Sequence, residues 1–321
     1  MITILLLIAG LVLIIFGANY LTEGSADLAK RMRVSDFVVG LTIVAMGTSM
    51  PEFVVSFMSA LQGKADVAVG NVVGSNLFNG LFILGITALI LPLKYTRNNL
   101  KKDIPFGVLA SVVLFVVASD TVLEKGAPAN VINRSEGLLM LGFFIIFMIY
   151  TVYSAQGPRR TKRVKQPVLV KRKLWLSLVM IGGGLAGLIF GGDLFLDNAI
   201  VLAQQLGVSE SVIAVTLLAG GTSLPELSAS VVSAVKKKPG MALGNVIGSN
   251  IFNIFFVLGT SAAVAPLTTG DIIPADMIAV IAASVLLFVC AYTFKKATLD
   301  RTEAVIFILL YVGYIVWLLN R

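Results

Sequence analysis

The sequence contains no histidine and only one cysteine, Cys290, among its 321 residues. Without histidine, the chain lacks the side chain that most often relays protons and binds transition metals. The same absence excludes a Ser-His-Asp catalytic site. A single cysteine in an apolar run excludes both a disulfide framework and a cysteine-bound metal. We therefore expect a protein that is not an enzyme and that has no resident cofactor.

Charged side chains are also scarce. Asp, Glu, Lys and Arg make up 13% of the chain, whereas 57% of the residues are hydrophobic and the mean hydropathy is +0.95. This composition excludes an ordinary soluble domain and predicts an all-α membrane protein. Ten apolar runs, of which the fourth is the shortest, are long enough to cross about 30 Å of hydrocarbon. They are 2–29, 35–61, 67–92, 104–119, 135–154, 174–204, 209–235, 241–266, 272–294 and 303–319.

The second run contains the motif GTSMPE at residues 47–52. A carboxylate in the middle of an apolar helix is costly, roughly 2.5–3.5 kcal/mol for an Asp at the helix centre. Pro51 removes a backbone N–H and crowds the carbonyl of Gly47, so a break in the helix is expected here. Thr48 and Ser49 lie four and three residues before Glu52, a spacing that allows all three to share one helix face. Their oxygens are ligands of the kind that hard cations prefer.

The motif is repeated 174 residues later as GTSLPE at residues 221–226. At the same offset, GNVVGSNLFN at 70–79 aligns with GNVIGSNIFN at 244–253. A shared register over about 70 residues indicates an internal duplication. We therefore predict a first five-helix repeat at 1–156, a linker at 157–173 and a second five-helix repeat at 174–321. Because each repeat has an odd number of spans, the two should have inverted topology, as in many secondary transporters.

The distribution of basic residues predicts the orientation in the membrane. With the N-terminus outside, 21 of the 25 Lys and Arg residues fall on the cytoplasmic side, eight of them in the linker. Only Lys64, Lys125, Arg134 and Arg321 remain outside. This asymmetry accounts for the net charge of +8 without a nucleic-acid partner. We expect a monomeric, multi-pass protein of the cell (inner) membrane, with the lipid bilayer as its partner.

Glu52 and Glu226 are the strongest candidates for a functional role. Hydroxyls and amides in membrane helices often serve only to join helices, but an ionisable group is not needed for that purpose. No basic residue lies in the middle of either span to pair with them. Two buried carboxylates surrounded by oxygens imply a bound cation, protons, or both. Glu23 and Asp27, near the inner end of the first run, are better explained as interfacial partners of basic groups.

These paired motifs resemble the α-repeats of the cation/calcium exchanger superfamily, and specifically the prokaryotic sodium/calcium exchangers. The resemblance covers nearly the whole chain and implies export of one Ca²⁺ in exchange for about three Na⁺. It also implies alternating access, in which the first and sixth helices slide against the other eight. By resemblance, main-chain carbonyls of Ala45 and Ala219 would join a set of side-chain ligands. That set is Thr48, Ser49, Glu52, Ser75, Asn79, Thr222, Ser223, Glu226, Ser249 and Asn253.

Asn253 departs from part of the family, because some relatives, including potassium-dependent exchangers, have Asp at this position. The site would then contain two carboxylates instead of three, which argues against K⁺ co-transport. A proton/calcium exchanger is an alternative, although those proteins usually have a different motif around the glutamate. A cation channel would also be compatible with an acidic midplane, but paired broken helices favour alternating access.

Overall fold

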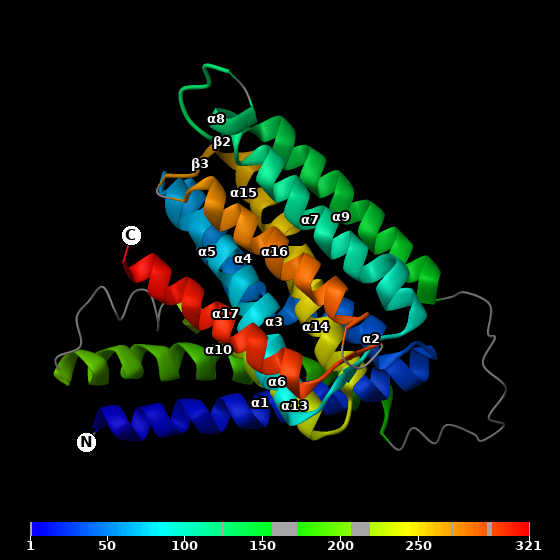
Figure 1. Cartoon of the computed structure of the whole chain (residues 1–321). Helices are drawn as coiled ribbons and strands as arrows, with labels where there is room; N and C mark the ends of the chain where they lie inside the picture. Colours follow the sequence, from blue (N-terminus) through cyan, green and yellow to red (C-terminus); the bar gives the residue numbers. More distant parts are fainter. Residues whose placement is uncertain are drawn as a thin grey trace.

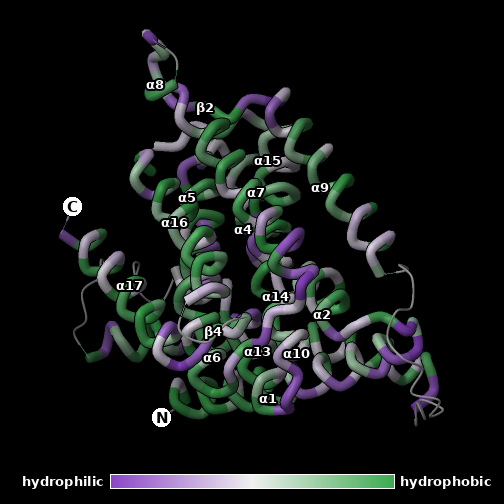
Figure 2. The backbone as a smooth tube through the Cα atoms, turned by 45° about the vertical axis from the view of Figure 1, so that its right-hand side comes forward, coloured by the Kyte–Doolittle hydropathy of each residue, from purple (hydrophilic) through white to green (hydrophobic). Residues whose placement is uncertain are grey.

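The computed structural model describes residues 2–123, 125–155, 172–206, 219–270, 272–293 and 297–320 (Figure 1). The regular secondary structure of the described residues is helical apart from two short antiparallel ladders. In one ladder β1 (Leu93–Lys94) pairs with β4 (Thr298–Leu299), and in the other β2 (Val131–Ile132) pairs with β3 (Leu267–Thr268). Each ladder joins the first half of the chain to the second, and β2 and β4 lie at opposite ends of the bundle (Figure 2).

The helices of the first half follow the predicted apolar runs closely. They are α1 (Ile2–Met32), α2 (Asp36–Val39), α3 (Ala45–Thr48), α4 (Met50–Leu61), α5 (Ala65–Leu77), α6 (Leu84–Ile90), α7 (Ile104–Val117), the short α8 (Asp120–Leu123) and α9 (Arg134–Ala155). Three π-helical segments complete them: η1 (Gly40–Val44), η2 (Phe78–Ile83) and η3 (Asn99–Asp103). The η1 and η2 segments continue their helices without a loop, so 36–48 and 65–90 are each one continuous rod.

The second half repeats this order. It contains α10 (Leu174–Gln205), α12 (Ala219–Gly221), α13 (Leu224–Val235), α14 (Pro239–Phe252), η5 (Asn253–Leu258), α15 (Gly259–Val264), α16 (Pro274–Cys290) and α17 (Arg301–Leu319). The first part of the predicted run 209–235 lies outside the described residues.

The predicted break in the second run is present. The rods 36–48 and 50–61 meet at Ser49 at an angle of 45°. Pro51 occupies the first turn of α4, where its missing N–H is tolerated, so the proline begins a new helix instead of continuing the old one. Pro225 has the same place in α13, which begins after Ser223. Both glutamates are thereby placed in the first turn of a helix, next to the positive end of its dipole.

The helices differ sharply in how much they are buried. In α14 and its continuation to Val264, 89% of the most apolar window is buried, and 72% in the matching helix from Ala65 to Ile90. The corresponding figure is only 17% for α17 and 22% for α1 and α9. The outer helices expose large apolar side chains such as Leu138, Ile149 and Leu309. The chain is thus an all-helical membrane protein that buries a set of polar side chains, Glu52 and Glu226 among them.

By length and composition, six described helices could cross a membrane, or seven if the bent pair at Ser49 counts as one span. The shorter apolar helices α13 and α16 fall below this length. The number of ten spans therefore remains a prediction.

Helices α1 and α10 form a closely packed pair, side by side along one face of the remaining helices (Figure 1). Glycines allow the backbones to meet: a Cβ at Gly17 would lie 2.7 Å from the Leu188 nitrogen, and one at Gly184 would lie 2.5 Å from the Leu21 nitrogen. Any larger residue at these positions would separate the two helices.

Candidate functional site

Glu52 and Glu226 are both fully buried at the centre of the protein. The Ser49 hydroxyl donates a hydrogen bond to Glu226 Oε1 at 2.6 Å, and the Ser223 hydroxyl donates to Glu52 Oε1 at 2.8 Å. Each serine therefore contacts the glutamate of the other half. This differs from the shared helix face expected from the sequence, because the helix ends at each serine and a new one begins.

The next helix of each half supplies a second serine. Ser75 of α5 donates to Glu52 Oε1 at 3.4 Å, and Ser249 of α14 donates to Glu226 Oε1 at 3.5 Å. Both hydroxyls are buried. The Oε2 atoms of the two glutamates have no hydrogen-bond partner among the described residues. Each carboxylate is thus held by one oxygen and leaves the other free to accept a ligand.

Asn79 and Asn253 lie one turn beyond these serines, in the π-helical segments η2 and η5. Single π-helical turns are rare and are often found at functional sites. Both asparagines are fully buried, and neither side-chain oxygen nor nitrogen has a partner among the described residues. An unsatisfied buried polar atom costs about 1–3 kcal/mol. Two amides left in this way indicate a place where a bound ion or water completes the contacts.

The threonines of the two motifs each contact an asparagine of the other half. The Thr48 hydroxyl donates to Asn245 Oδ1 at 3.2 Å, and the Thr222 hydroxyl donates to Asn71 Oδ1 at 3.3 Å. Sequence reasoning did not select Asn71 and Asn245, although both stand in the repeated GN motif. Their presence at the same offset of 174 residues as the other site residues was the available signal.

The two predicted carbonyl ligands are placed differently. The Ala45 carbonyl accepts long hydrogen bonds from Thr48 at 3.4 Å and from Ser249 at 3.5 Å, so it faces the site. Ala219 begins the short helix α12, immediately before Gly220, and no contact of its carbonyl is described.

The site is dominated by oxygen atoms. In the described part of the chain, the ion pairs involve Glu23 and Asp27 and not the two central glutamates. Nor do the described residues contain a group of three or more His, Cys, Asp or Glu side chains arranged to hold a metal. Two carboxylates among neutral hydroxyl, amide and carbonyl oxygens suit hard cations such as Na⁺ and Ca²⁺.

Glu23 and Asp27 belong to a separate network at one end of α1. Arg172 contacts Glu23 at 2.7 Å and Asp27 at 3.0 Å, and Lys236 contacts Glu23 at 2.7 Å. Hydrogen bonds to Glu23 and Asp27 raise the pKa of the Arg172 guanidinium, so the group remains protonated. The network joins α1 to the segment before α10 and to the turn after α13.

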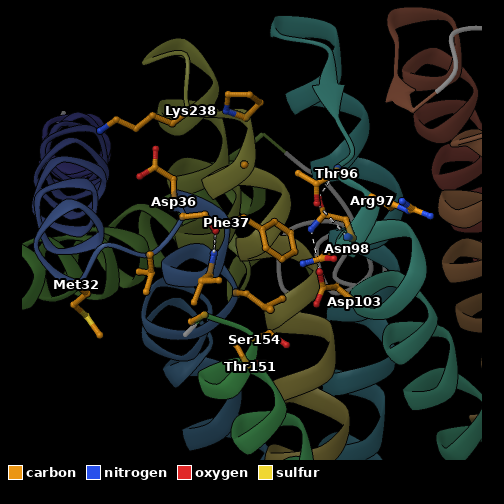
Figure 3. A pocket seen from close by; sticks show the side chains of 18 of the residues that line it. Met32, Asp36, Phe37, Thr96, Arg97, Asn98, Asp103, Thr151, Ser154 and Lys238 are labelled. Carbon is orange, nitrogen blue, oxygen red and sulfur yellow. Dashed lines mark hydrogen bonds between the residues drawn. The ribbon is translucent and has the colours of Figure 1, made fainter. Parts of the chain in front are cut away.

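A cavity of about 1110 Å³ opens at the end of the bundle that carries these basic residues. Figure 3 shows Asp36 and Phe37 of α2 on one wall, with Thr96 and Asp103 on the other. Asp103 accepts hydrogen bonds from Asn99 at 3.0 Å and from Tyr150 at 3.1 Å. None of the predicted ion ligands lines this cavity.

Comparison with known proteins adds independent information. The family model described as "Sodium/calcium exchanger protein" matches residues 2–153 and 176–320. The putative antiporter CaxA of Alkalimonas amylolytica is 34% identical, over 96% of this chain and 95% of its own. The sodium/calcium exchanger MaX1 of Methanosarcina acetivorans is 32% identical, over 97% of both chains. The solved structure of the sodium-calcium exchanger NCX_Mj is similar with a TM-score of 0.83 and 31% identity, over 98% of each chain.

Proposed function

This chain belongs to the sodium/calcium exchanger protein family, and we propose that it is an antiporter that exports one Ca²⁺ in exchange for about three Na⁺. The observation that carries this proposal is the pair of buried glutamates, each with one oxygen hydrogen-bonded to serines and the other without a partner. A divalent cation desolvated in a low-dielectric interior needs both negative charges, because neutral oxygens alone cannot replace its hydration.

The fixed charge of the site determines whether each transport cycle moves net charge across the membrane. With Asn79 and Asn253 both neutral, the proposed ligands contribute −2, from Glu52 and Glu226. One Ca²⁺ would leave the loaded site neutral, whereas three Na⁺ would leave it at +1. The exchange is therefore electrogenic in our proposal, with one net charge moved per cycle. A third carboxylate for a K⁺ ion is absent from the proposed ligand set, so K⁺ should not be required.

The proposed architecture is ten transmembrane helices in two inverted repeats, 1–156 and 174–321, with the linker 157–173 in the cytoplasm. One support is the pair of serine–glutamate hydrogen bonds, in which each serine contacts the glutamate of the other half and the two pairs are related by the 174-residue offset. Another is the match of the family model in two separate segments. In this orientation the N-terminus is outside. Single cysteines introduced into the linker of a Cys290→Ala variant should resist an impermeant thiol reagent applied to intact cells. Ready labelling would contradict the orientation.

Alternating access is proposed to involve movement of the α1–α10 pair against the other helices. The glycine-lined contact makes these two helices a unit, while their outer faces are largely exposed. Such a pair meets the rest of the protein along only one side, and its movement would uncover the site from one side of the membrane at a time.

The direct test is ⁴⁵Ca²⁺ uptake into proteoliposomes loaded with Na⁺. An outward Na⁺ gradient should drive uptake, whereas pH and K⁺ gradients of the same size should not. Uptake driven by the pH gradient instead would identify a proton/calcium exchanger. Calcium flux that follows its own gradient without any counter-ion would identify a channel.

A further inference from the structure

We propose that Asn71 and Asn245 are positioning residues that direct the hydroxyl proton of the opposite half's threonine away from the ion. In this way Thr222 and Thr48 present lone pairs to the cation. The inference rests on the proposed function, since it concerns how two proposed ligands are held. It begins from a set of hydrogen bonds that occurs twice, once in each half of the protein.

The orientation of each carboxamide is determined by its neighbours. Asn245 Nδ2 lies 3.3 Å from the main-chain carbonyl of Glu226 and 3.0 Å from Ser230 Oγ. Asn71 Nδ2 lies 3.2 Å from the Glu52 carbonyl and 2.9 Å from Ser56 Oγ. A main-chain carbonyl can only accept, so the amide nitrogen must be the atom that faces it. The amide oxygen must then face the threonine.

An amide oxygen also can only accept, and this determines where the threonine proton goes. The Thr48 hydroxyl lies 3.2 Å from Asn245 Oδ1 and 3.4 Å from the Ala45 carbonyl oxygen, which already accepts the Ser49 N–H at 3.0 Å. Donation to the nearer Asn245 leaves both lone pairs of the Thr48 hydroxyl unoccupied. A hydroxyl whose proton pointed toward a cation would be repelled by it. Asn245 therefore makes the hydroxyl oxygen of Thr48 available to the ion.

The other half extends the same chain of donors. Thr222 donates to Asn71 Oδ1, Asn71 Nδ2 donates to Ser56, and Ser56 donates to the Ala68 carbonyl at 3.2 Å. This sequence of donors passes through Ser56 of α4 and ends at the main-chain carbonyl of Ala68 in α5. Because Asn71 also contacts the main-chain carbonyl of Glu52, it links the backbone of the glutamate of its own half to a hydroxyl of the other.

The test is a double-mutant cycle in proteoliposomes with Asn71→Ala, Thr222→Val and the combined variant. Asn71→Ala should raise the half-saturating concentrations of Na⁺ and Ca²⁺ about three- to tenfold, the effect of one lost hydrogen bond. The maximal rate per folded protein should stay close to wild type. In the Thr222→Val background, Asn71→Ala should add little, because the hydroxyl it directs is gone. Asn245→Ala with Thr48→Val should behave in the same way.

The matched control is Asn250→Ala, on the same helix as Asn245. Asn250 donates to the Asn76 carbonyl at 3.3 Å and, among the described residues, has no hydrogen bond to a motif threonine or to a glutamate. It should keep the wild-type half-saturating concentrations. Fully additive effects in both cycles, or a loss of maximal rate with unchanged ion affinity, would overturn the positioning role. Absence of Na⁺-driven uptake in the wild type would instead refute the proposed function, so the two failures are distinguishable.

Discussion

The two threonine–asparagine contacts are chemically equivalent but differ in how deeply they are buried. Thr48 and Asn245 are buried, whereas Thr222 and Asn71 are half-buried. At the buried contact, α14 packs directly against the rod 36–48: a Cβ at Gly244 would lie 2.3 Å from the Phe37 carbonyl oxygen, and one at Gly248 would lie 2.3 Å from that of Leu41. The same oxygen groups are therefore present in both halves, but they differ in burial. We infer that ion affinity depends on the oxygen groups that both halves share. The access of ions to these groups should depend on how deeply each half buries them.

The largest expected effect should be the same in both halves. Glu52→Gln and Glu226→Gln should each reduce Na⁺-driven ⁴⁵Ca²⁺ uptake at least about 100-fold, since a desolvated divalent ion would lose one of two compensating charges. Both variants should remain folded on size-exclusion chromatography. Asp66→Asn, a change to an exposed carboxylate on α5, is the matched control and should transport normally. Near-normal uptake in one glutamine variant would show that its half is not required.

Asn253→Asp would break the match between Asn79 and Asn253. A third buried carboxylate close to two others is disfavoured in its charged form by burial and by like charges. We expect roughly tenfold weaker Na⁺/Ca²⁺ exchange, together with a dependence on external pH or on K⁺ that the wild type lacks. Asn79→Asp should behave similarly if the halves are equivalent. Flux measured at several pH values, with choline in place of K⁺ as control, checks both; unchanged exchange would place the amides outside the site.

Because Thr48 is more deeply buried than Thr222, we expect the two positions to differ in their accessibility to reagents in water. In a Cys290→Ala background, Thr222→Cys should react with a small water-soluble thiol reagent several-fold faster than Thr48→Cys, because Thr222 is less buried. The rates can be measured on purified protein in detergent. Equal rates would mean that the protein exchanges rapidly between states that expose each half in turn. Faster reaction at Thr48→Cys would contradict the greater burial of position 48.

The smallest effect concerns the network that joins the α1–α10 pair to the end of α13. Lys236→Met removes the contact to Glu23. The Lys236 and Glu23 side chains are 22% and 35% exposed. Because a partly exposed ion pair contributes about 0–1 kcal/mol, the exchange rate should change no more than about fivefold. The ion affinities should remain normal, and the wild-type rate should approach that of the variant at high salt. A change in Ca²⁺ affinity would link this network to the site itself.

Much of the site could be predicted from the sequence. A carboxylate next to proline in an apolar run indicated both the broken helix at Ser49 and the buried glutamate, and the 174-residue repeat located its counterpart. The partner of each side chain could not be predicted in this way. Ser49 contacts Glu226, 177 residues away, because α4 and α13 meet at their broken ends. Such contacts depend on tertiary packing, which a local helical spacing does not report.

The π-helical segments at Asn79 and Asn253 were also not anticipated. Their sequences, FNGLFI and NIFFVL, read as ordinary apolar helix, and the wider turn depends on packing against neighbouring helices. The positions of Asn71 and Asn245 were visible in the repeat, but their role depends on which acceptor faces each amide nitrogen. That information exists only in three dimensions.

The most direct test of the account is the charge moved per calcium ion. In proteoliposomes whose voltage is set by valinomycin and K⁺, Na⁺-driven Ca²⁺ uptake should respond to voltage as expected for one net charge per cycle, about 2.3 kcal/mol per 100 mV. A second set clamped by a proton conductor without K⁺ should give the same uptake at the same voltage. Exchange that ignores voltage, or that stops without K⁺, would contradict a site of two carboxylates that alternates between one Ca²⁺ and three Na⁺.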